Sequence, residues 1–210
     1  MITKEIAQKV LTTVDAGLVS GLGRPILGQM GIEAAVCYAL RLPHGDNPKD
    51  CVASSLIQLK TKLNDGFSSN KTRTKGLRKL ALLQLGTAGV LNEVEFVNKL
   101  TLLVITKYLP SALKTMDFNK EATACEQAKD LNEAKKAART ANTAVRTANV
   151  VDAVAYAAYT DYAAYVTTGA TVYNPPAVDA DDKVLTSFAE DVAQILISMD
   201  VPGIQWLDLL

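Results

Sequence analysis

The stretch DCVASSLIQLKTKLNDG, residues 50–66, contains the pattern that much of this chain repeats. Its apolar residues recur at the spacing of one helix face: Val52, Leu56, Leu59 and Leu63. Asp50 is a suitable N-cap, and Asn64-Asp65-Gly66 ends the helix because glycine tolerates the left-handed conformation of a helix C-terminus. The segment therefore predicts an amphipathic helix with one buried face.

The same spacing predicts helices on both sides of this segment. They are expected from a Thr3 cap to about residue 16, from about 28 to 40, from a Ser68 or Ser69 cap to 85, from 93 to a stop at Pro110, and from 181 to 199. No alternating strand pattern is convincing. We expect an all-α protein: a single compact helical domain over residues 1–210, with about seven to eight helices. Its site-bearing part is 17–86, and an Ala/Tyr-rich part over 119–168 forms one long helix or a helix pair.

The composition limits the partners and the compartment. The chain has 210 residues, 49% of them hydrophobic, which is enough for a real core. The 22 basic and 22 acidic residues cancel, so no general attraction to long nucleic acid or to an anionic membrane is expected. Three cysteines without metal-type spacing indicate reduced core thiols. The longest apolar run, 100–109, is too short to span a bilayer. We therefore expect a cytoplasmic protein without a metal or a cofactor.

Glu33 is the first candidate for function. It lies on the helix face that must be buried, and a buried lone carboxylate must pair, accept hydrogen bonds or protonate. It could be a ligand-binding or catalytic carboxylate. Equally, it could be a first-turn acid favoured by the helix dipole and bonded to the amides of 28–30, beside Gln29 and Met30.

His44 and Asp46 lie in a turn bounded by Pro43 and Pro48, which can direct an imidazole and a carboxylate into a cleft. The more frequent arrangement is structural: Asp46 or Asp50 caps the next helix and His44 braces the loop. One histidine cannot build the usual zinc site.

The start of the helix that follows Ser68 and Ser69 is basic. Free amides, two hydroxyls and several cations there could hold a phosphate, with Lys75 and Arg78 nearby. Arg78 lies beside the apolar side and is the best candidate to point inward. These charges could instead form a solvated face, and a buried arginine that faces Glu33 could be a structural pair.

Five of the seven tyrosines lie between 156 and 173. Their spacing of three residues drifts around a helix, so some must be buried, while others, such as Tyr159, could stack on a planar ligand. Helix packing or an oligomer interface would explain them equally well. No Walker A, Gly-x-Ser-x-Gly or His-Glu-x-x-His signature is present.

The pattern Gly21-x-Gly23-x-Pro25-x-x-Gly28-x-Met30-x-x-Glu33-Ala34-Ala35-Val36, followed by Pro43-His44-Gly45-Asp46 and Lys75-Gly76-Leu77-Arg78, resembles an all-helical group of bacterial and phage-borne proteins. The Ala/Tyr-rich helix is loosely similar to helices in proteins labelled immunity proteins. The resemblance implies a setting, the conflict between bacteria, phages and toxins, and assigns no catalytic residue.

From these residues we expect a non-catalytic protein that binds a small anionic, nucleotide-like ligand. In a phage, such a protein could act as a sponge that removes a defence signal. We also expect a homo-oligomer. The expected ligand-binding residues are Arg24, Gln29, Met30, Glu33, His44, Asp46, Ser68, Ser69, Lys75, Arg78 and Tyr159. An immunity or antitoxin-like factor that binds a protein is the first alternative. A metal-assisted hydrolase that uses Glu33, His44 and Asp46 is the second.

Overall fold

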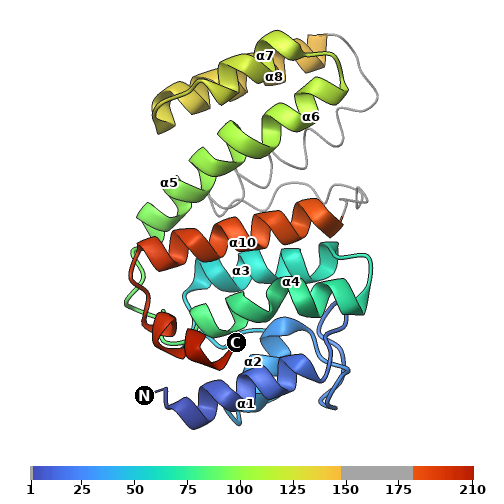
Figure 1. Ribbon diagram of the computed structural model, residues 1–210, viewed down its shortest axis with the longest axis vertical. Coiled ribbons are helices and arrows are strands. Elements are labelled where there is room, and N and C mark those ends of the chain that lie inside the picture. Colours follow the sequence, from blue (N-terminus) through green and yellow to red (C-terminus); the bar gives the residue numbers. More distant parts are fainter. Residues whose placement is uncertain (1, 148–181) are drawn as a thin grey trace. The chain divides into compact units, whose positions relative to one another are not determined.

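The computed structural model describes residues 2–147 and 182–210 of the chain. These residues form nine α-helices and no β-strand, which confirms the predicted all-α fold (Figure 1). Where the sequence predicted one domain, the contacts divide the chain into two compact units. One comprises Met1–Phe96 with Asp179–Leu210, and the other comprises Val97–Val178. Within the described ranges, none of the helices combines the length and the apolar character that crossing a bilayer requires.

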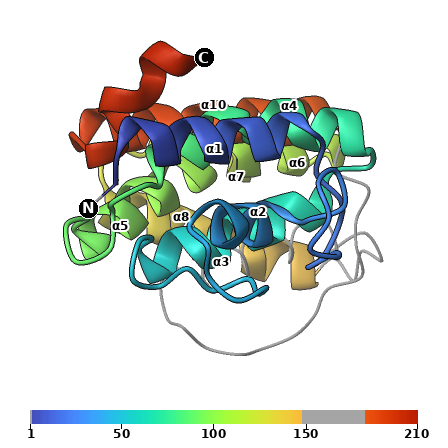
Figure 2. The ribbon, with the colours of Figure 1, turned by 90° about the horizontal axis from the view of Figure 1, so that it is seen from below.

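The first unit is built around α4. Its helices are α1 (Lys4–Asp15), α2 (Ile32–Ala39), α3 (Ser54–Gly66), α4 (Asn70–Leu83) and α10 (Asp182–Ser198), followed by a 3-10 helix, η2 (Pro202–Leu209). α4 contacts all the others, and α1 also lies against α2 (Figure 2). The central position of α4 explains why leucines at 77, 80, 82 and 83 are all buried.

Two helix starts follow the predicted capping chemistry. Thr3 Oγ1 accepts the Ile6 N–H at 3.3 Å, and Ser69 Oγ accepts the Thr72 N–H at 3.2 Å. The predicted Asp50 cap of α3 is wrong, since α3 begins at Ser54 behind Ala53, whose side chain cannot cap.

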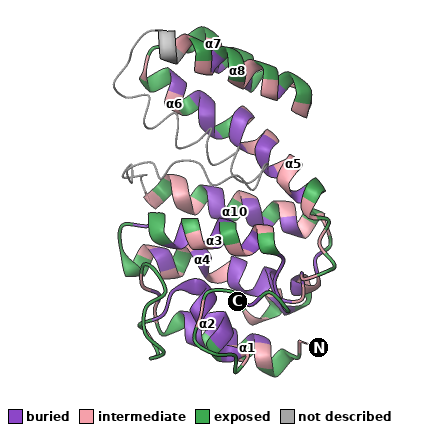
Figure 3. Ribbon diagram, turned by 180° about the vertical axis from the view of Figure 1, so that it is seen from behind, coloured by how far each residue is buried: buried purple, intermediate pink, exposed green. Residues whose placement is uncertain are grey.

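α2 begins at Ile32, four residues later than expected. The preceding segment is a folded loop in which Gly21, Gly23 and Gly28 have φ angles of 68°, 70° and 79°. Those angles belong to the left-handed region, which interrupts a right-handed helix and favours glycine. α2 itself is buried along nearly its whole length (Figure 3).

The second unit contains most of α5 (Glu93–Leu103), the π-helical turn η1 (Val104–Tyr108), α6 (Leu109–Thr115), α7 (Asn119–Glu126) and α8 (Leu131–Thr147). The predicted stop at Pro110 is wrong, because the helical path continues to Thr115. Proline removes one N–H donor, and the wider π turn just before it accommodates that loss. The core of this unit combines Ile105, Leu109 and Leu113 with small residues of α7 and α8. The rest of the Ala/Tyr-rich stretch, including Tyr159, lies outside the described residues.

Candidate functional site

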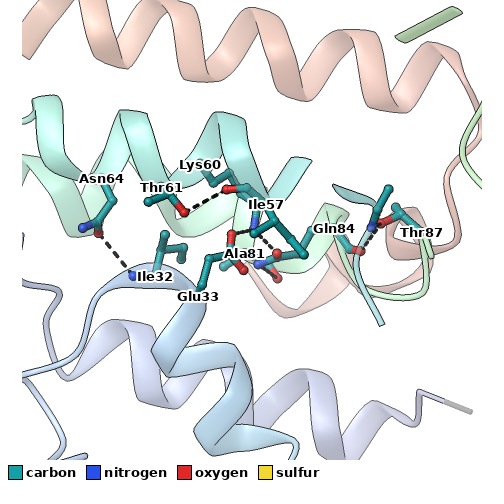
Figure 4. Close-up of polar contacts among 10 residues, drawn as sticks. Ile32, Glu33, Ile57, Lys60, Thr61, Asn64, Ala81, Gln84 and Thr87 are labelled. Carbon is teal, nitrogen blue, oxygen red and sulfur yellow. Dashed lines mark hydrogen bonds and ion pairs between the residues drawn. The ribbon is translucent and has the colours of Figure 1, made fainter. Parts of the chain in front are cut away.

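Glu33 is buried, as its helix phase predicted, and its partner is a lysine. Glu33 is 2% exposed in the first turn of α2, and Lys60 of α3 is fully buried. Lys60 Nζ donates to Glu33 Oε1 at 2.5 Å and also to the side-chain oxygen of Gln84, at the end of α4 (Figure 4). One ammonium group thus connects three segments of the first unit.

Burial shifts the pKa of both charged groups toward their neutral forms. Desolvation raises the pKa of Glu33 and lowers that of Lys60, and the attraction between the two opposes both shifts. Glu33 Oε2 is buried and has no hydrogen-bond partner. Buried carboxylate oxygens are nearly always bonded, so this atom needs an explanation.

Hydrogen bonds to its backbone and to its side chain hold Gln84 in place. Its carbonyl accepts the Thr87 hydroxyl at 2.7 Å, and Thr87 Oγ1 accepts the Ala53 N–H at 3.0 Å. The amide side chain also donates to Ala81 O at 3.3 Å. The acceptor for Lys60 is therefore anchored to the turns that flank α3 and α4.

A cavity of about 110 Å³ lies beside Glu33. Its wall joins the loop at Gly21 and Leu22, the start of α2 with Glu33, Asp46, and the end of α3 at Asn64 and Asp65. Gly21, Leu22, Asp46 and Asp65 are exposed, so the cavity opens to solvent. A single water needs only about 10–15 Å³ of such space, so the cavity has room for several waters or a small organic group.

The end of α3 fixes the rim of the cavity. Asp65 Oδ1 accepts the Gly21 N–H at 2.6 Å, and Asn64 Oδ1 accepts the Ile32 N–H at 3.2 Å. A Cβ at Gly31 would lie 2.0 Å from Gly21 O, so only glycine allows the loop to approach α2 this closely. The end of α3 therefore holds both the loop at Gly21 and the start of α2 in place.

The structure brings Glu33 and Asp46 to one cavity and places His44 close by. His44 is exposed, and its Nε2 lies 3.2 Å from the backbone oxygen of Gly23. It therefore braces the loop that contains Gly21, Gly23 and Gly28, called the glycine loop below, as the structural alternative for His44 predicted. Among residues 2–147 and 182–210, no group of three or more His, Cys, Asp or Glu side chains could hold a metal ion.

The phosphate-binding residues predicted on α4 do not line the cavity. Ser68 donates its N–H and hydroxyl to Asp182 at 2.8 and 2.7 Å. Arg78 donates to the Asp15 carboxylate at 2.7 and 3.0 Å, which raises the pKa of its guanidinium. Ser69 is the α4 cap described above, and Lys75 is exposed. These groups are separate from the acidic cavity, so the expected single pocket does not form from them.

The inward-pointing arginine of α4 is Arg73, and the prediction that it is Arg78 is wrong. Arg73 is 3% exposed and donates to the backbone oxygens of Asn64 and Phe67 at 2.5 and 2.6 Å. A guanidinium there satisfies carbonyls at the end of α3 that have no intrahelical partner. Its role is structural.

The remaining predicted residues divide between surface and core. Arg24 and Gln29 are exposed on the loop, whereas Met30 is 1% exposed and pairs through its backbone with Leu18 and Gly23. Met30 is thus a core residue that does not line the cavity, contrary to its predicted ligand-binding role.

Lys60 and Gln84 are the polar residues that sequence analysis missed. A signal for Lys60 was present: it lies four residues after Leu56 and three before Leu63, on the apolar side of α3. A lysine at such a position requires a buried acceptor, and Glu33 was already the leading buried acid.

Comparison of the chain with protein-family models, with curated protein sequences and with solved structures found no match. The resemblance to phage-borne and immunity proteins therefore stays a prediction, and the function is inferred from the geometry.

Proposed function

We propose that this protein binds a small polar ligand without chemically changing it, in the cavity between the glycine loop, the start of α2 and the end of α3. The observation that carries the proposal is the cavity itself, with Glu33 in its wall and a rim held by Asn64 and Asp65. Ligand sites are typically concave and preformed, with a few polar groups that fix orientation.

The reactive side chains near the cavity support binding rather than catalysis. Burial raises the pKa of the Cys37 thiol to about 11, which leaves it a weak nucleophile at neutral pH. Lys60 has no exposed surface through which to meet a substrate. The metal-assisted hydrolase, the second alternative, has no support from the described acidic residues.

A nucleotide-like ligand remains the proposed class. Its base or sugar would donate hydrogen bonds to the cavity carboxylates, and its phosphate would lie outside the cavity wall, which contains no basic residue of the described chain. The first turn of α2 also lines the cavity. Asn64 accepts its Ile32 N–H, and the N-cap residue, Gly31, has no side chain with which to satisfy the amides that follow. A phage sponge for a defence signal is one use of such a protein.

The test is isothermal titration calorimetry of the full chain against a panel of mononucleotides and cyclic nucleotides, with native mass spectrometry for any molecule that co-purifies. Asp46→Asn should weaken binding, because it changes the cavity wall. Asp50→Asn, in the same loop but outside the cavity wall, is the matched control. If no nucleotide binds and no small molecule co-purifies, the proposal fails.

A second candidate is the immunity or antitoxin-like factor, and one observation favours it. The loop side chains of Leu22, Ile26 and Leu27 are 41%, 51% and 51% exposed. Exposed apolar side chains that gather on one loop are typical of protein-binding surfaces. Ile26→Ser with Leu27→Ser should then abolish capture of one stoichiometric protein partner, while Val90→Ser, at an exposed apolar site on another loop, should not.

A further inference from the structure

The glycine loop holds apolar side chains outward. Leu18 and Met30 anchor the two ends of the loop in the core, where both are buried. Between them, the side chains of Leu22, Ile26 and Leu27 are exposed to solvent. Exposed apolar side chains that lie together favour a contact surface, because burial against another molecule removes them from water.

The backbone of the loop fixes this outward arrangement. The Arg24 N–H donates to the Gln29 oxygen at 2.6 Å, and the Gly31 N–H donates to the Leu22 oxygen at 3.1 Å, so the two arms of the loop are tied together. A Cβ at Gly23 would lie 2.1 Å from the Gln29 oxygen, so only glycine allows the two arms to approach this closely. A loop that is already ordered loses little conformational freedom on association, which favours its use as a contact surface.

Two charges of opposite sign accompany the apolar side chains. Arg24 lies within the loop, and Asp46 shares the cavity wall with Leu22. His44, whose ring contacts the Gly23 oxygen, joins the turn that carries Asp46 to the loop that carries Arg24. Both charged side chains are exposed, and within residues 2–147 and 182–210 neither forms a hydrogen bond or an ion pair. The same region of the surface therefore offers a cation, an anion and apolar area.

We propose that two copies of this chain associate through this surface, which is formed by Leu22, Arg24, Ile26, Leu27 and Asp46. In a two-fold dimer the same patch serves on both copies, so a patch that carries both charges is complementary to itself. Arg24 of each copy then meets Asp46 of the other copy, and the apolar side chains pack between these two pairs. The 22 basic and 22 acidic residues cancel, so no long-range repulsion opposes the association. The inference goes beyond the proposed ligand binding and does not depend on it.

The experiment is sedimentation equilibrium of the full chain. The patch is small and small interfaces are typically weak, so the measurements cover about 1 µM to about 1 mM protein. The apparent mass should rise toward that of a dimer across this range. Ile26→Ser with Leu27→Ser should abolish the rise, and Val90→Ser, at an exposed apolar site on another loop, should retain it.

Exchanging the charges tests the pairing across the two-fold axis. Arg24→Asp places two acids opposite each other and should weaken the dimer about tenfold, and Asp46→Arg should do the same with two bases. The double variant, Arg24→Asp with Asp46→Arg, again sets opposite charges against each other and should recover most of the affinity. Lys75→Asp changes an exposed cation outside the patch and is the matched control.

A chain that stays monomeric at every concentration would overturn the inference and leave the loop to a foreign protein, the second candidate above. A dimer that persists in the Ile26→Ser/Leu27→Ser variant would place the contact elsewhere and would also overturn it. If the double charge variant is no better than the two single ones, the pairing of Arg24 with Asp46 is refuted. Silent nucleotide titrations would count against the proposed function alone, because the dimer needs no ligand.

Discussion

Replacing Lys60 with methionine tests the buried pair most directly. Methionine is close to lysine in length and keeps the packing of α3, but it removes the ammonium group that bonds Glu33 and Gln84. The Glu33 carboxylate would then be buried without a counter-charge. Breaking a buried pair on one side typically costs about 3–5 kcal/mol. Domains are usually stable by only about 5–15 kcal/mol, so the loss is large.

The pair can also be removed from both sides. Glu33→Leu with Lys60→Met leaves no buried charge, and such replacements are often neutral or stabilising by about 1–4 kcal/mol. The double variant should therefore be much more stable than Lys60→Met alone. Lys62→Met, on the exposed side of the same helix, is the matched control and should lower stability much less than Lys60→Met does.

The assay is urea unfolding followed by the fluorescence of Trp206, the only tryptophan in the chain. Trp206 is buried in the 3-10 helix that contacts α4, so its signal reports the first unit specifically. If Lys60→Met unfolds at the same urea concentration as Lys62→Met, or if the double variant is no better than the single one, the buried ion pair is not what the geometry indicates.

The same variant has a predictable pH dependence. Burial raises the pKa of Glu33, and Lys60 opposes that rise, so removing Lys60 raises the pKa further. Folded Lys60→Met then holds a proton on Glu33 that the unfolded chain releases above its ordinary pKa near 4.5. Stability of the variant, relative to the parent, should fall as pH rises from that value toward the folded pKa. An unchanged difference between the two proteins from pH 5 to pH 8 would contradict this.

Three further outcomes follow from local geometry. Gly76→Ala should lower the free energy of unfolding by about 1–3 kcal/mol, because the new Cβ would lie 2.4 Å from the Phe67 ring. This loss outweighs the higher helix propensity of alanine. An unchanged urea midpoint would show that the ring moves aside. Arg73→Met should cost about 2–4 kcal/mol, since it removes charged donors to buried carbonyls, and Arg73→Lys should not restore the loss. Burial raises the pKa of the Cys37 and Cys125 thiols to about 11, so only about one thiol in a thousand is ionised at pH 8. Both thiols should react slowly with Ellman's reagent in the folded protein and quickly in urea. Fast reaction of the folded protein would refute their burial.

What the sequence could predict was local. The Ser69 cap and the burial of Glu33 follow from a hydroxyl before a helix and from helix phase, both visible within one or two turns. The partner of Glu33 could not be found that way, because Lys60 is 27 residues away and the pairing depends on how α2 packs against α3.

The misplaced arginine has a similar physical cause. Arg73 and Arg78 are five residues apart on α4, so they point in different directions, and helix phase alone gave the wrong one. The capping geometry at the end of α3 decides which is buried. The continuation of the helix through Pro110 was likewise hidden, since the π turn that accommodates it has no sequence signature.

The order of the chain through the first unit also bears on how the protein is made. α10 lies against α4, yet more than ninety residues separate them along the chain, and the closing ion pair joins Lys4 to Asp208 at 2.7 Å. A ribosome therefore synthesises the apolar face of α4 long before the helix that covers it. During that interval the face of α4 that α10 covers is exposed on the nascent chain, and transiently exposed apolar surface of this kind favours aggregation.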